Sequence, residues 1–353
     1  MTGALTDEQR GLRDAVHTLL GKRSDGAAVR RALEAPAGYD EDLWQVLCQQ
    51  IGVAALVVPE KFGGLGAGLR EVQLVTEELG RALTPSPMLG SVLSASLLVA
   101  LGDDDASDRL LPPIGEGTVT AVAWSGAAGQ WATGAMRADG DRLTGEAHYV
   151  LDGDIAEILL VVAGGAVYEV DPSDAERVHT PTMDLTRRLA RIRLDGAAGV
   201  RIGPADAAHG LAAALEAAIV ALAAEQVGAA AGALEMTVEY AKVRHQFGRP
   251  IGSFQALKHR MADLHVLLEA ARSAAYAAAD GSVHPSVAKA HCSEAFRTIA
   301  AETIQLHGGI AITWEHDAHL YFKRAHNSGE LFGSPGHHVA QLADNATERG
   351  TDE

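Results

Sequence analysis

The sequence has very few of the residues that stabilise small extracellular proteins. Its 2 cysteines, Cys48 and Cys292, lie far apart in a chain of 353 residues. A disulfide scaffold needs several closely spaced cysteines, so we expect two free core thiols in a reducing cytoplasm. Aromatic residues make up only 5% of the chain. The remaining composition is rich in Ala, Leu and Val, which favours helix.

Positive charge is also scarce. The chain has 29 Lys and Arg against 46 Asp and Glu, which gives a formal net charge of −17. This balance argues against nucleic acid or an anionic membrane surface as a partner, because both repel a strongly acidic protein. A local basic patch can still bind an anionic ligand, so the charge does not exclude a CoA ester.

The sequence lacks the patterns of targeting and membrane-spanning segments. Residues 1–8 have neither a basic region nor an apolar stretch, so we expect no signal peptide. The longest apolar run, Leu211–Ala233, is interrupted by Glu216 and Glu225 and is rich in Ala rather than Leu. It therefore predicts a buried helix rather than a membrane span.

The hydrophobic period changes twice along the chain and divides it into three predicted domains. Residues 1–117 are expected to be helical, with Thr6 as the first cap. Residues 118–205 contain short alternating segments separated by Gly and Asp turns, which predict a compact all-β domain of about 85 residues. Residues 206–353 predict a bundle of four long apolar helices, near 207–242, 254–279, 285–306 and 316–326.

One stretch of the third domain carries groups suited to a dinucleotide. Between Tyr240 and Gln255 the sequence reads Tyr-Ala-Lys-Val-Arg-His-Gln-Phe-Gly-Arg-Pro-Ile-Gly-Ser-Phe-Gln. We expect a helix to end near the tyrosine, and a turn with Arg244, Gln246 and Phe247 to precede the next helix. Arginine binds phosphate oxygens with a two-pronged fork, and the start of a helix adds positive potential. The turn therefore suits the diphosphate of a dinucleotide, although such residues also occur at ordinary surface corners.

This turn resembles the FAD-contacting turn of the acyl-CoA dehydrogenase family, and other segments repeat the resemblance in the same order. Leu43–Gly66 and Glu77–Arg81 are similar to parts of the family's N-terminal domain. Leu143–Glu146 is similar to part of its central β-domain. Gln305–Ile310 matches a Gln-x-x-Gly-Gly motif of its C-terminal domain. Together these segments cover nearly the whole chain.

The resemblance implies an α+β multidomain fold with an N-terminal helical domain, a central β-barrel-like domain and a C-terminal four-helix bundle. It also implies an acyl-CoA substrate and the cofactor FAD, which in the family lies between subunits. One subunit's β-domain holds the flavin ring, while a neighbour's helical domain binds the ADP end. Carried over position by position, the ADP-side contacts are Arg244, Gln246, Phe247, Gln255, Gln305, Gly308 and Gly309.

The two glycines of this set have an alternative interpretation. Glycine lets a backbone approach a ligand closely, which suits Gly308 and Gly309 to an ADP site. Glycine is also common directly after a helix, where it only terminates the helix. The presence of the motif at Arg244–Gln255 in the same chain favours the functional interpretation.

The flavin-ring side of the resemblance is weaker. Family members usually carry a Thr-Glu-Pro-x-x-Gly-Ser-type loop after the first strand, whereas Val122–Gly129 here has no acidic residue and no proline. The family's aromatic-x-Thr motif becomes Tyr149-Val150-Leu151. Tyr149 has a ring that could stack on a flavin, but Leu151 has no hydroxyl to bond flavin N5 or O4. A purely structural β-domain is therefore an open alternative.

Both positions at which the family places its catalytic base lack a carboxylate. The reaction needs a carboxylate to remove the α-proton of the thioester while hydride leaves the β-carbon. A Glu-Gly-Thr/Ser motif becomes Phe332-Gly333-Ser334, and the other position falls on Ala218. Glu216 is a candidate substitute, but two positions turn it by about 200° around a helix. Glu225 is expected to make a buried structural contact, and Glu330 to face solvent.

A metal site is not expected. Histidines gather near the C-terminus, and a His-x-x-His spacing on a helix is compatible with metal binding. No cysteine and no matched set of carboxylates accompanies them in the sequence. The histidines are His316, His319, His326, His337 and His338.

Two functions from different classes are open. In the first, the chain is a non-catalytic companion, similar to one subunit of the heterotetrameric steroid-type acyl-CoA dehydrogenases of bacteria. In the second, it is a catalytic homotetramer that uses Glu216 or Glu225 as base. Electron-transfer flavoprotein would be the electron acceptor in both cases. Retained ADP-side motifs and a missing base favour the companion. A helical binding protein without flavin would require both ADP-side motif matches to be chance.

Overall fold

The computed structural model describes residues 5–129, 131 and 134–350, with side chains described up to residue 344. The chain forms two compact units. Unit 1 comprises residues 1–29, 73–84 and 222–353, and unit 2 comprises residues 30–72 and 85–221. Helix α7 (Ala208–Val243) runs from unit 2 into unit 1. The boundaries predicted at residues 117/118 and 205/206 stay predictions.

The helical part of unit 2 consists of short elements. Asp40 caps helix α3, because its carboxylate accepts a hydrogen bond from the Leu43 N–H at 2.9 Å. Trp44 on the same helix donates its indole N–H to the Gly117 carbonyl at 2.8 Å, next to the first strand of the sheet. The elements are the end of α2 (Gly26–Glu34), α3 (Glu41–Val46), the π-helical turn η1 (Leu47–Ile51), the 3₁₀ turns η2 (Val53–Ala55) and η3 (Glu60–Phe62), α5 (Met88–Leu101) and α6 (Asp104–Gly115).

The strands of unit 2 close into a barrel, as predicted for an all-β domain. Pairing runs around the ring β4–β2–β3–β7–β5 and returns to β4. Strand β1 adds to β4 in parallel, and β6 adds to β7 antiparallel. The described strands are β1 (Thr120–Ala123), β2 (Met136–Asp139), β3 (Arg142–Leu151), β4 (Ile158–Ala163), β5 (Ala166–Val170), β6 (Glu176–His179) and β7 (Leu189–Ile202), with a 3₁₀ turn η4 (Pro172–Asp174) before β6.

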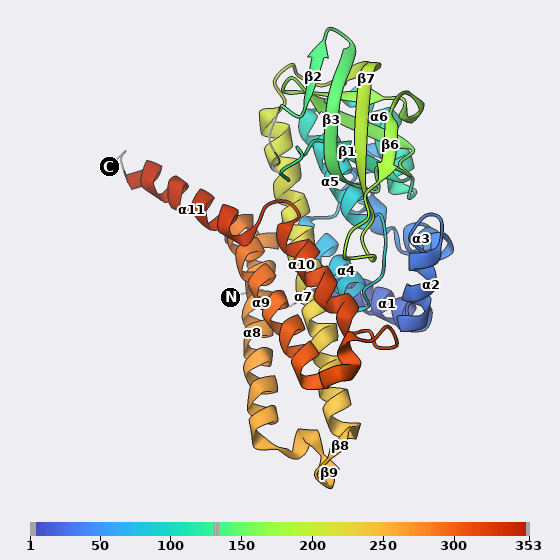
Figure 1. The fold of residues 1–353 in the computed structure, drawn as a ribbon. Helices are drawn as coiled ribbons and strands as arrows, with labels where there is room; N and C mark the ends of the chain where they lie inside the picture. The colour runs from blue at the N-terminus through green and yellow to red at the C-terminus, as the bar shows by residue number, and fades with distance from the viewer. Residues whose placement is uncertain (1–4, 130, 132–133, 351–353) are drawn as a thin grey trace. The chain divides into compact units, whose positions relative to one another are not determined.

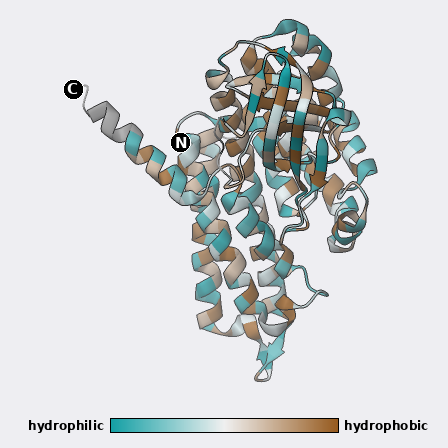
Figure 2. Cartoon of the chain, turned by 45° about the horizontal axis from the view of Figure 1, so that its top comes forward, coloured by the Kyte–Doolittle hydropathy of each residue, from teal (hydrophilic) through white to brown (hydrophobic). Residues whose placement is uncertain are grey.

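The interior of the barrel is apolar. Leu143, Leu159 and Ile192 are fully buried in one cluster, and hydrophobic and hydrophilic residues succeed one another along the strands (Figure 2). Strand β2 was not predicted, because Met136 is its only fully buried residue. Strand β1 was predicted from alternation, but all four of its residues are buried. A strand covered on both faces does not alternate.

Asp152, directly after β3, is a buried carboxyl group with a left-handed backbone. Its φ is 52°, and it is 7% exposed. Burial raises the pKa of the Asp152 carboxyl to about 7, because the carboxylate loses its hydration, while Arg187 opposes the shift. In an unfolded chain this pKa is about 4. The folded state therefore binds the proton more tightly, and ionisation of Asp152 lowers the free energy of unfolding as the pH rises from about 4 to 7.

We therefore expect Asp152→Asn to raise the thermal midpoint at pH 8 and to raise it less at pH 5. Asparagine tolerates a left-handed backbone and has no charge to bury; a shift of about three pKa units corresponds to at most ~4 kcal/mol. Calorimetry at both pH values measures the effect. Asp154→Asn is the control, because Asp154 accepts two bonds from Arg188 at 2.9 and 2.7 Å and its loss should lower both midpoints. A lower midpoint for Asp152→Asn at pH 8 would contradict the expectation.

Unit 1 is a helical bundle in which α8 and α10 both pack on α9 (Figure 1). The predicted four helices are confirmed as α7, α8, α9 and α10, whereas α11 was not predicted. Thr6 caps α1, with its hydroxyl accepting the Gln9 N–H at 3.1 Å. Besides α7, the helices are α1 (Asp7–Arg23), most of α4 (Leu69–Arg81), α8 (Gln255–Ala279), α9 (Pro285–His307), α10 (Ala318–Glu330) and α11 (Pro335–Gly350).

Helix α7 is apolar enough to resemble a membrane span by length and composition. Its most apolar window of 18 residues has a mean hydropathy of 1.6, and 94% of that window is buried inside the protein. Burial of this extent is typical of a core helix. It agrees with the prediction made for Leu211–Ala233.

Helices α4 and α7 touch through their backbones. A Cβ at Gly228 would overlap the Glu77 carbonyl group and lie 2.9 Å from the Arg81 nitrogen. A Cβ at Gly80 would lie 2.8 Å from the carbonyl carbon of Glu225. Real Cβ atoms do not come this close to backbone atoms, so glycine is required at both positions.

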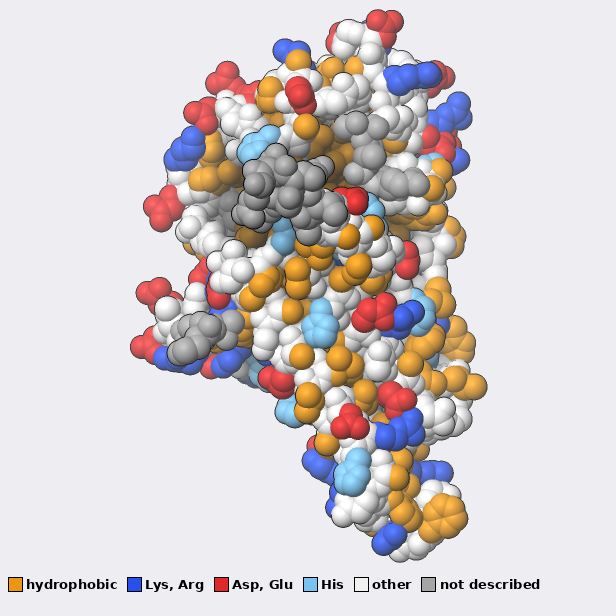
Figure 3. Space-filling model, turned by 90° about the vertical axis from the view of Figure 1, so that its left-hand side faces the viewer, with side chains coloured by type: hydrophobic (Ala, Val, Ile, Leu, Met, Phe, Trp, Pro, Cys, Tyr) orange, Lys and Arg blue, Asp and Glu red, His pale blue; other side chains and the backbone are white. Residues whose placement is uncertain are grey.

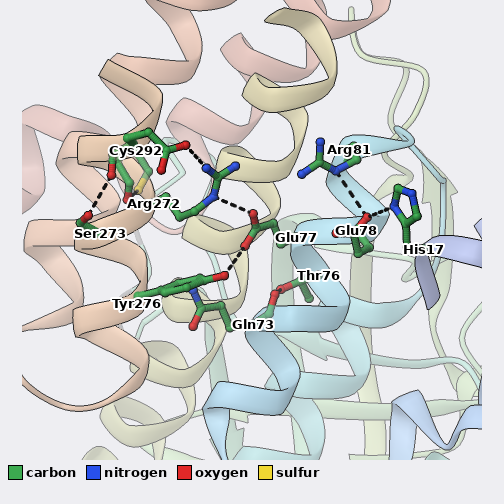
Figure 4. Close-up of polar contacts among 12 residues, drawn as sticks. His17, Gln73, Thr76, Glu77, Glu78, Arg81, Arg272, Ser273, Tyr276 and Cys292 are labelled. Carbon is green, nitrogen blue, oxygen red and sulfur yellow. Dashed lines mark hydrogen bonds and ion pairs between the residues drawn. The ribbon is translucent and has the colours of Figure 1, made fainter. Parts of the chain in front are cut away.

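Two adjacent carboxylates of α4 point in different directions (Figure 4). Glu77 accepts bonds from Arg272 Nε at 3.0 Å and from the Tyr276 hydroxyl at 3.3 Å, both on α8. Glu78 lies 2.8 Å from His17 Nδ1 on α1. Both carboxylates are buried, so α4 connects α1 to α8 through polar contacts.

Candidate cofactor and active site

A β-hairpin forms the Arg-x-Gln-Phe-Gly turn that was predicted between two helices. Strands β8 (His245–Gln246) and β9 (Arg249–Pro250) pair antiparallel. Phe247 and Gly248 connect them with φ values of 53° and 76°. Positive φ at both central residues is what a tight type I′ hairpin turn requires. The turn places the Phe247 ring in solvent, with 90% of the residue exposed.

The segment around the hairpin is basic in an otherwise acidic chain. From Tyr240 to Ala262 it contains no Asp or Glu, and Figure 3 shows Lys and Arg side chains at the lower tip of the molecule, where the hairpin lies. A positive patch of this kind attracts an anionic ligand despite the negative total charge. The basic residues are Lys242, Arg244, Arg249, Lys258 and Arg260.

Lys242 and Arg260 of this patch pair with Glu239 and Glu302, whereas Arg244 has free donors. Its side chain is exposed, and among the described residues its guanidinium has no ion-pair or hydrogen-bond partner. The Arg244 carbonyl accepts the Ile251 N–H at 2.8 Å, which fixes the base of the hairpin. Helix α8 then begins at Gln255 without a side-chain cap. Free N–H groups at a helix start and a free guanidinium are both suited to phosphate oxygens.

The Gln-x-x-Gly-Gly motif lies where α9 ends. Gln305 is exposed, and Gly308 begins the 3₁₀ turn η6 (Gly308–Ile312) with φ 67° and ψ −147°. Only glycine adopts that backbone conformation readily. A Cβ at Gly308 or Gly309 would meet no atom within 4 Å, so both glycines border open space.

The structure brings the two predicted ADP-side segments to the same end of the bundle. The ring of Tyr240, four residues before Arg244, stacks on the ring of His307 with 4.3 Å between centroids. His307 directly precedes Gly308. Sequence reasoning missed this stack, because no local pattern pairs residues so far apart in the chain.

The segment expected to face the flavin ring follows β1 and is described up to Gly129. The segment after β1 is held to β3, because the His148 N–H donates to the Ser125 carbonyl at 2.9 Å and the Ser125 hydroxyl donates to the His148 carbonyl. The register shifts between Ala147 and Val150, and Tyr149 takes a left-handed φ of 54° in this bulge. Tyr149 is partly exposed, whereas Leu151 is 5% exposed. Leu151 therefore offers a buried methyl surface at the position where the resemblance predicts a hydroxyl.

The two expected base positions are buried and apolar. Phe332 is 1% exposed, and Ala218 is fully buried. Glu225 forms an ion pair with Arg324 on α10, with 2.9 Å between Oε1 and Nη1. Both side chains are largely buried. Arg324 therefore compensates the negative charge of Glu225, as expected of a structural ion pair. Glu216 lies on an exposed position of α7, and Glu330 ends α10 in solvent.

A buried polar network that sequence reasoning missed holds the turn at Phe332. Phe332 has a left-handed φ of 61°, and its carbonyl lies 3.0 Å from His338 Nε2. Burial lowers the pKa of His338 to about 4, so its ring is neutral at pH 7. Lys289, fully buried, donates from Nζ to the carbonyls of Ser328 and Gly329 at 3.0 and 2.9 Å. A cation at the last carbonyls of α10 complements the negative end of that helix.

The structure shows no metal centre in its described part. No group of three His, Cys, Asp or Glu side chains with metal-ligand geometry occurs there. His316 instead contacts His307 edge to face, with 4.6 Å between centroids. His319 contacts Trp314 in the same way at 4.9 Å. These histidines serve packing.

Comparison with known proteins shows which family shares this architecture. The model of the acyl-CoA dehydrogenase N-terminal domain matches residues 6–118, and that of the acyl-CoA dehydrogenase C-terminal domain matches residues 210–346. The chain is 46% identical over 331 residues to acyl-CoA dehydrogenase IpdE2 of Mycobacterium tuberculosis, which covers 93% of this chain and 94% of that protein.

Solved structures show the same similarity. The Tcur3481–Tcur3483 steroid ACAD superposes with a TM-score of 0.86 and 29% identity, over 98% of this chain and 99% of the other. The ChsE4–ChsE5 complex from Mycobacterium tuberculosis superposes with a TM-score of 0.87 and 26% identity, over 98% of each chain. The predicted fold, with an N-terminal helical domain, a central β-barrel and a C-terminal helical domain, is confirmed.

Proposed function

Because the chain belongs to the acyl-CoA dehydrogenase family of FAD-dependent oxidoreductases, which act on a CH–CH bond, we propose that it is the companion subunit of a heteromeric acyl-CoA dehydrogenase. In this role it contributes ADP-side contacts to FAD, while the partner subunit contributes the flavin-ring pocket and the base. One observation carries the proposal. The segment around Arg244 is basic, whereas the two positions expected to hold the base are Phe332 and Ala218. The hairpin with Arg244, the start of α8 and the segment Gln305–Gly309 are called the ADP clamp below.

The residues of the clamp fit the ADP half of FAD. Arg244 has free donors for the pyrophosphate oxygens, and the uncapped start of α8 at Gln255 adds positive potential. Gln246 and Gln305 are exposed amides that could bond the nucleotide. Gly308 borders open space in which the nucleotide could lie close to the protein backbone. When bound, FAD accepts the hydride that leaves the β-carbon of the acyl-CoA.

Among the candidate positions in the described part of the chain, we find no side chain suited to remove the α-proton. Neither Phe332 nor Ala218 can accept a proton. Glu225 is held by Arg324, and its protonation would leave a buried guanidinium without its partner. Glu216 is exposed, whereas a general base for this reaction works in a site from which water is excluded. We therefore assign proton removal to the partner subunit.

Apolar side chains around the clamp support an obligate partner. Five large apolar residues near the end of α7 and around η6 are exposed, which is unusual for the surface of a chain that functions alone. Burial against a second subunit would remove them from water. The residues and their exposed fractions are Val243 70%, Phe247 90%, Ile310 40%, Ile312 75% and Trp314 63%.

The names of the structural relatives extend the proposal to a substrate class. One relative is a steroid acyl-CoA dehydrogenase, and the other is a complex of two named chains. We therefore propose an acyl-CoA thioester with a steroid-derived acyl group as substrate, electron-transfer flavoprotein as electron acceptor, and the cytoplasm as location.

The direct test of this function is turnover. Purified alone and supplied with FAD, acyl-CoA and an electron-accepting dye, the chain should show no turnover, whereas its complex with the partner subunit should turn over. Glu216→Gln in the complex should leave the rate unchanged, because this residue is not the base. Steady turnover by the isolated chain that Glu216→Gln abolishes would overturn the proposal in favour of the catalytic homotetramer.

A further inference from the structure

The proposed ADP clamp is assembled from two segments that are distant in sequence. Arg244 and the hairpin follow the end of α7, whereas Gly308 and η6 follow the end of α9. A ligand that contacts both segments binds well only if their relative placement is fixed before it arrives, because ordering two loops would reduce the affinity. The residues that fix this placement therefore influence the affinity for FAD.

Helices α7 and α9 are joined just before the two segments leave them. The Thr237 hydroxyl of α7 donates to the Thr303 hydroxyl of α9 at 3.0 Å, and both residues are fully buried. One helical turn further on, the Tyr240 ring stacks on the His307 ring at 4.3 Å with 27° between the planes. The Tyr240 hydroxyl also donates to the His307 carbonyl at 3.3 Å.

This stack lies next to both halves of the clamp. The Tyr240 carbonyl accepts the Arg244 N–H at 2.8 Å, so the last turn of α7 carries the arginine. His307 is 4% exposed, and its Nδ1 lies 2.8 Å from the Thr303 carbonyl at the end of α9. This bond identifies Nδ1 as the protonated nitrogen, and it orients the ring. The next residue, Gly308, takes the conformation that only glycine readily adopts.

His307 is suited to stacking because its ring is buried and neutral. Its Nε2 is buried and has no hydrogen-bond partner among the described residues, so the ring is not retained for a complete set of polar contacts. Burial, together with the neighbouring His316, lowers the pKa of His307, which keeps the ring neutral. A neutral flat ring is what stacking on Tyr240 needs.

We infer that Tyr240 and His307 are positioning residues that couple the two halves of the ADP clamp, so that FAD affinity depends on their stack. This inference rests on the proposed function, since it assumes that Arg244 and Gly308 contact the same cofactor. Neither ring is assigned a contact with FAD. Their effect acts through the placement of the hairpin and of η6.

The experiment measures the FAD dissociation constant of the assembled complex with variants of each ring. Tyr240→Leu should weaken FAD binding roughly three- to tenfold, the fold-change expected when an aromatic pair is lost. Tyr240→Phe should stay within about twofold, because the stack survives without the hydroxyl. His307→Phe should likewise retain FAD, since a neutral flat ring remains.

A control separates positioning from general stability. Leu268→Ala truncates a buried residue of α8 that lies about 20 Å along the helix from Gln255. It should lower the thermal midpoint at least as much as Tyr240→Leu without changing the FAD dissociation constant. If Leu268→Ala weakens FAD to the same extent, or if Tyr240→Phe fails to restore binding, the positioning role is overturned.

Arg244→Ala distinguishes this inference from the function on which it rests. If Arg244→Ala weakens FAD binding and Tyr240→Leu does not, the coupling is wrong and the clamp stands. If neither substitution changes the affinity, both the coupling and the assignment of the clamp are wrong. Weakening by both, with rescue by Tyr240→Phe and His307→Phe, supports the coupling.

Discussion

Gly228→Ala should destabilise the bundle severely. The added Cβ would overlap the backbone carbonyl group of Glu77 on α4, and neither helix backbone can yield locally. The helices would have to separate, which would also disturb the bonds from Arg272 and Tyr276 to Glu77. We expect a loss of about 3 kcal/mol or more, which corresponds to a decrease of roughly 4 °C or more in the thermal midpoint of a chain of this length.

Gly21→Ala is the matched control for this substitution. Gly21 also lies in a helix, α1, but a Cβ there would meet no atom within 4 Å. Alanine has the higher helix propensity, so the free energy of unfolding should rise by up to about 1 kcal/mol. The thermal midpoint should therefore stay the same or rise. Scanning calorimetry of both variants measures the difference. Equal midpoints for Gly228→Ala and Gly21→Ala would show that α4 and α7 do not touch through their backbones.

Arg244→Ala should have the largest effect on the cofactor. If the guanidinium bonds the pyrophosphate, each lost bond to a charged group removes about 1.5–3 kcal/mol of binding free energy. The FAD dissociation constant should therefore rise roughly tenfold to 150-fold. The fold should survive, because the side chain is exposed and has no partner among the described residues. Flavin fluorescence of the dialysed complex measures retention, and circular dichroism measures helix content.

Two further variants specify the role of this arginine. Arg244→Lys keeps the charge but loses the planar fork, so it should restore binding only in part. Arg297→Ala removes an exposed arginine of α9 that pairs with Glu294, and it should leave FAD binding unchanged. Full FAD retention by Arg244→Ala would remove this residue from the clamp.

Period and composition were sufficient to predict the main elements of the fold. Apolar residues at helical spacing predicted α7 to α10, and short segments between Gly and Asp turns predicted most barrel strands. Strand β2 was not predicted, because Met136 is its only fully buried residue. Helix α11 was not predicted. It follows a turn at Phe332-Gly333-Ser334 in which Phe332 takes a positive φ, and no local pattern predicts such a turn at a phenylalanine.

The candidate site could be predicted in its residue types but not in its geometry. The arginine, the amides and the glycines were readable in order, whereas the hairpin was not, because Phe247 is a residue type that seldom takes a positive φ. The Tyr240–His307 stack and the Glu225–Arg324 ion pair join residues far apart in sequence. Such contacts depend on how helices pack, which no local pattern specifies.

The most direct test of the companion-subunit account is the number of FAD molecules per chain. Native mass spectrometry of the complex, combined with flavin absorbance, gives the subunit composition and the flavin content together. The account predicts a heterotetramer with about one FAD for every two chains, because only one class of interface combines a flavin pocket with this clamp. A homotetramer of this chain saturated with about one FAD per chain would contradict it.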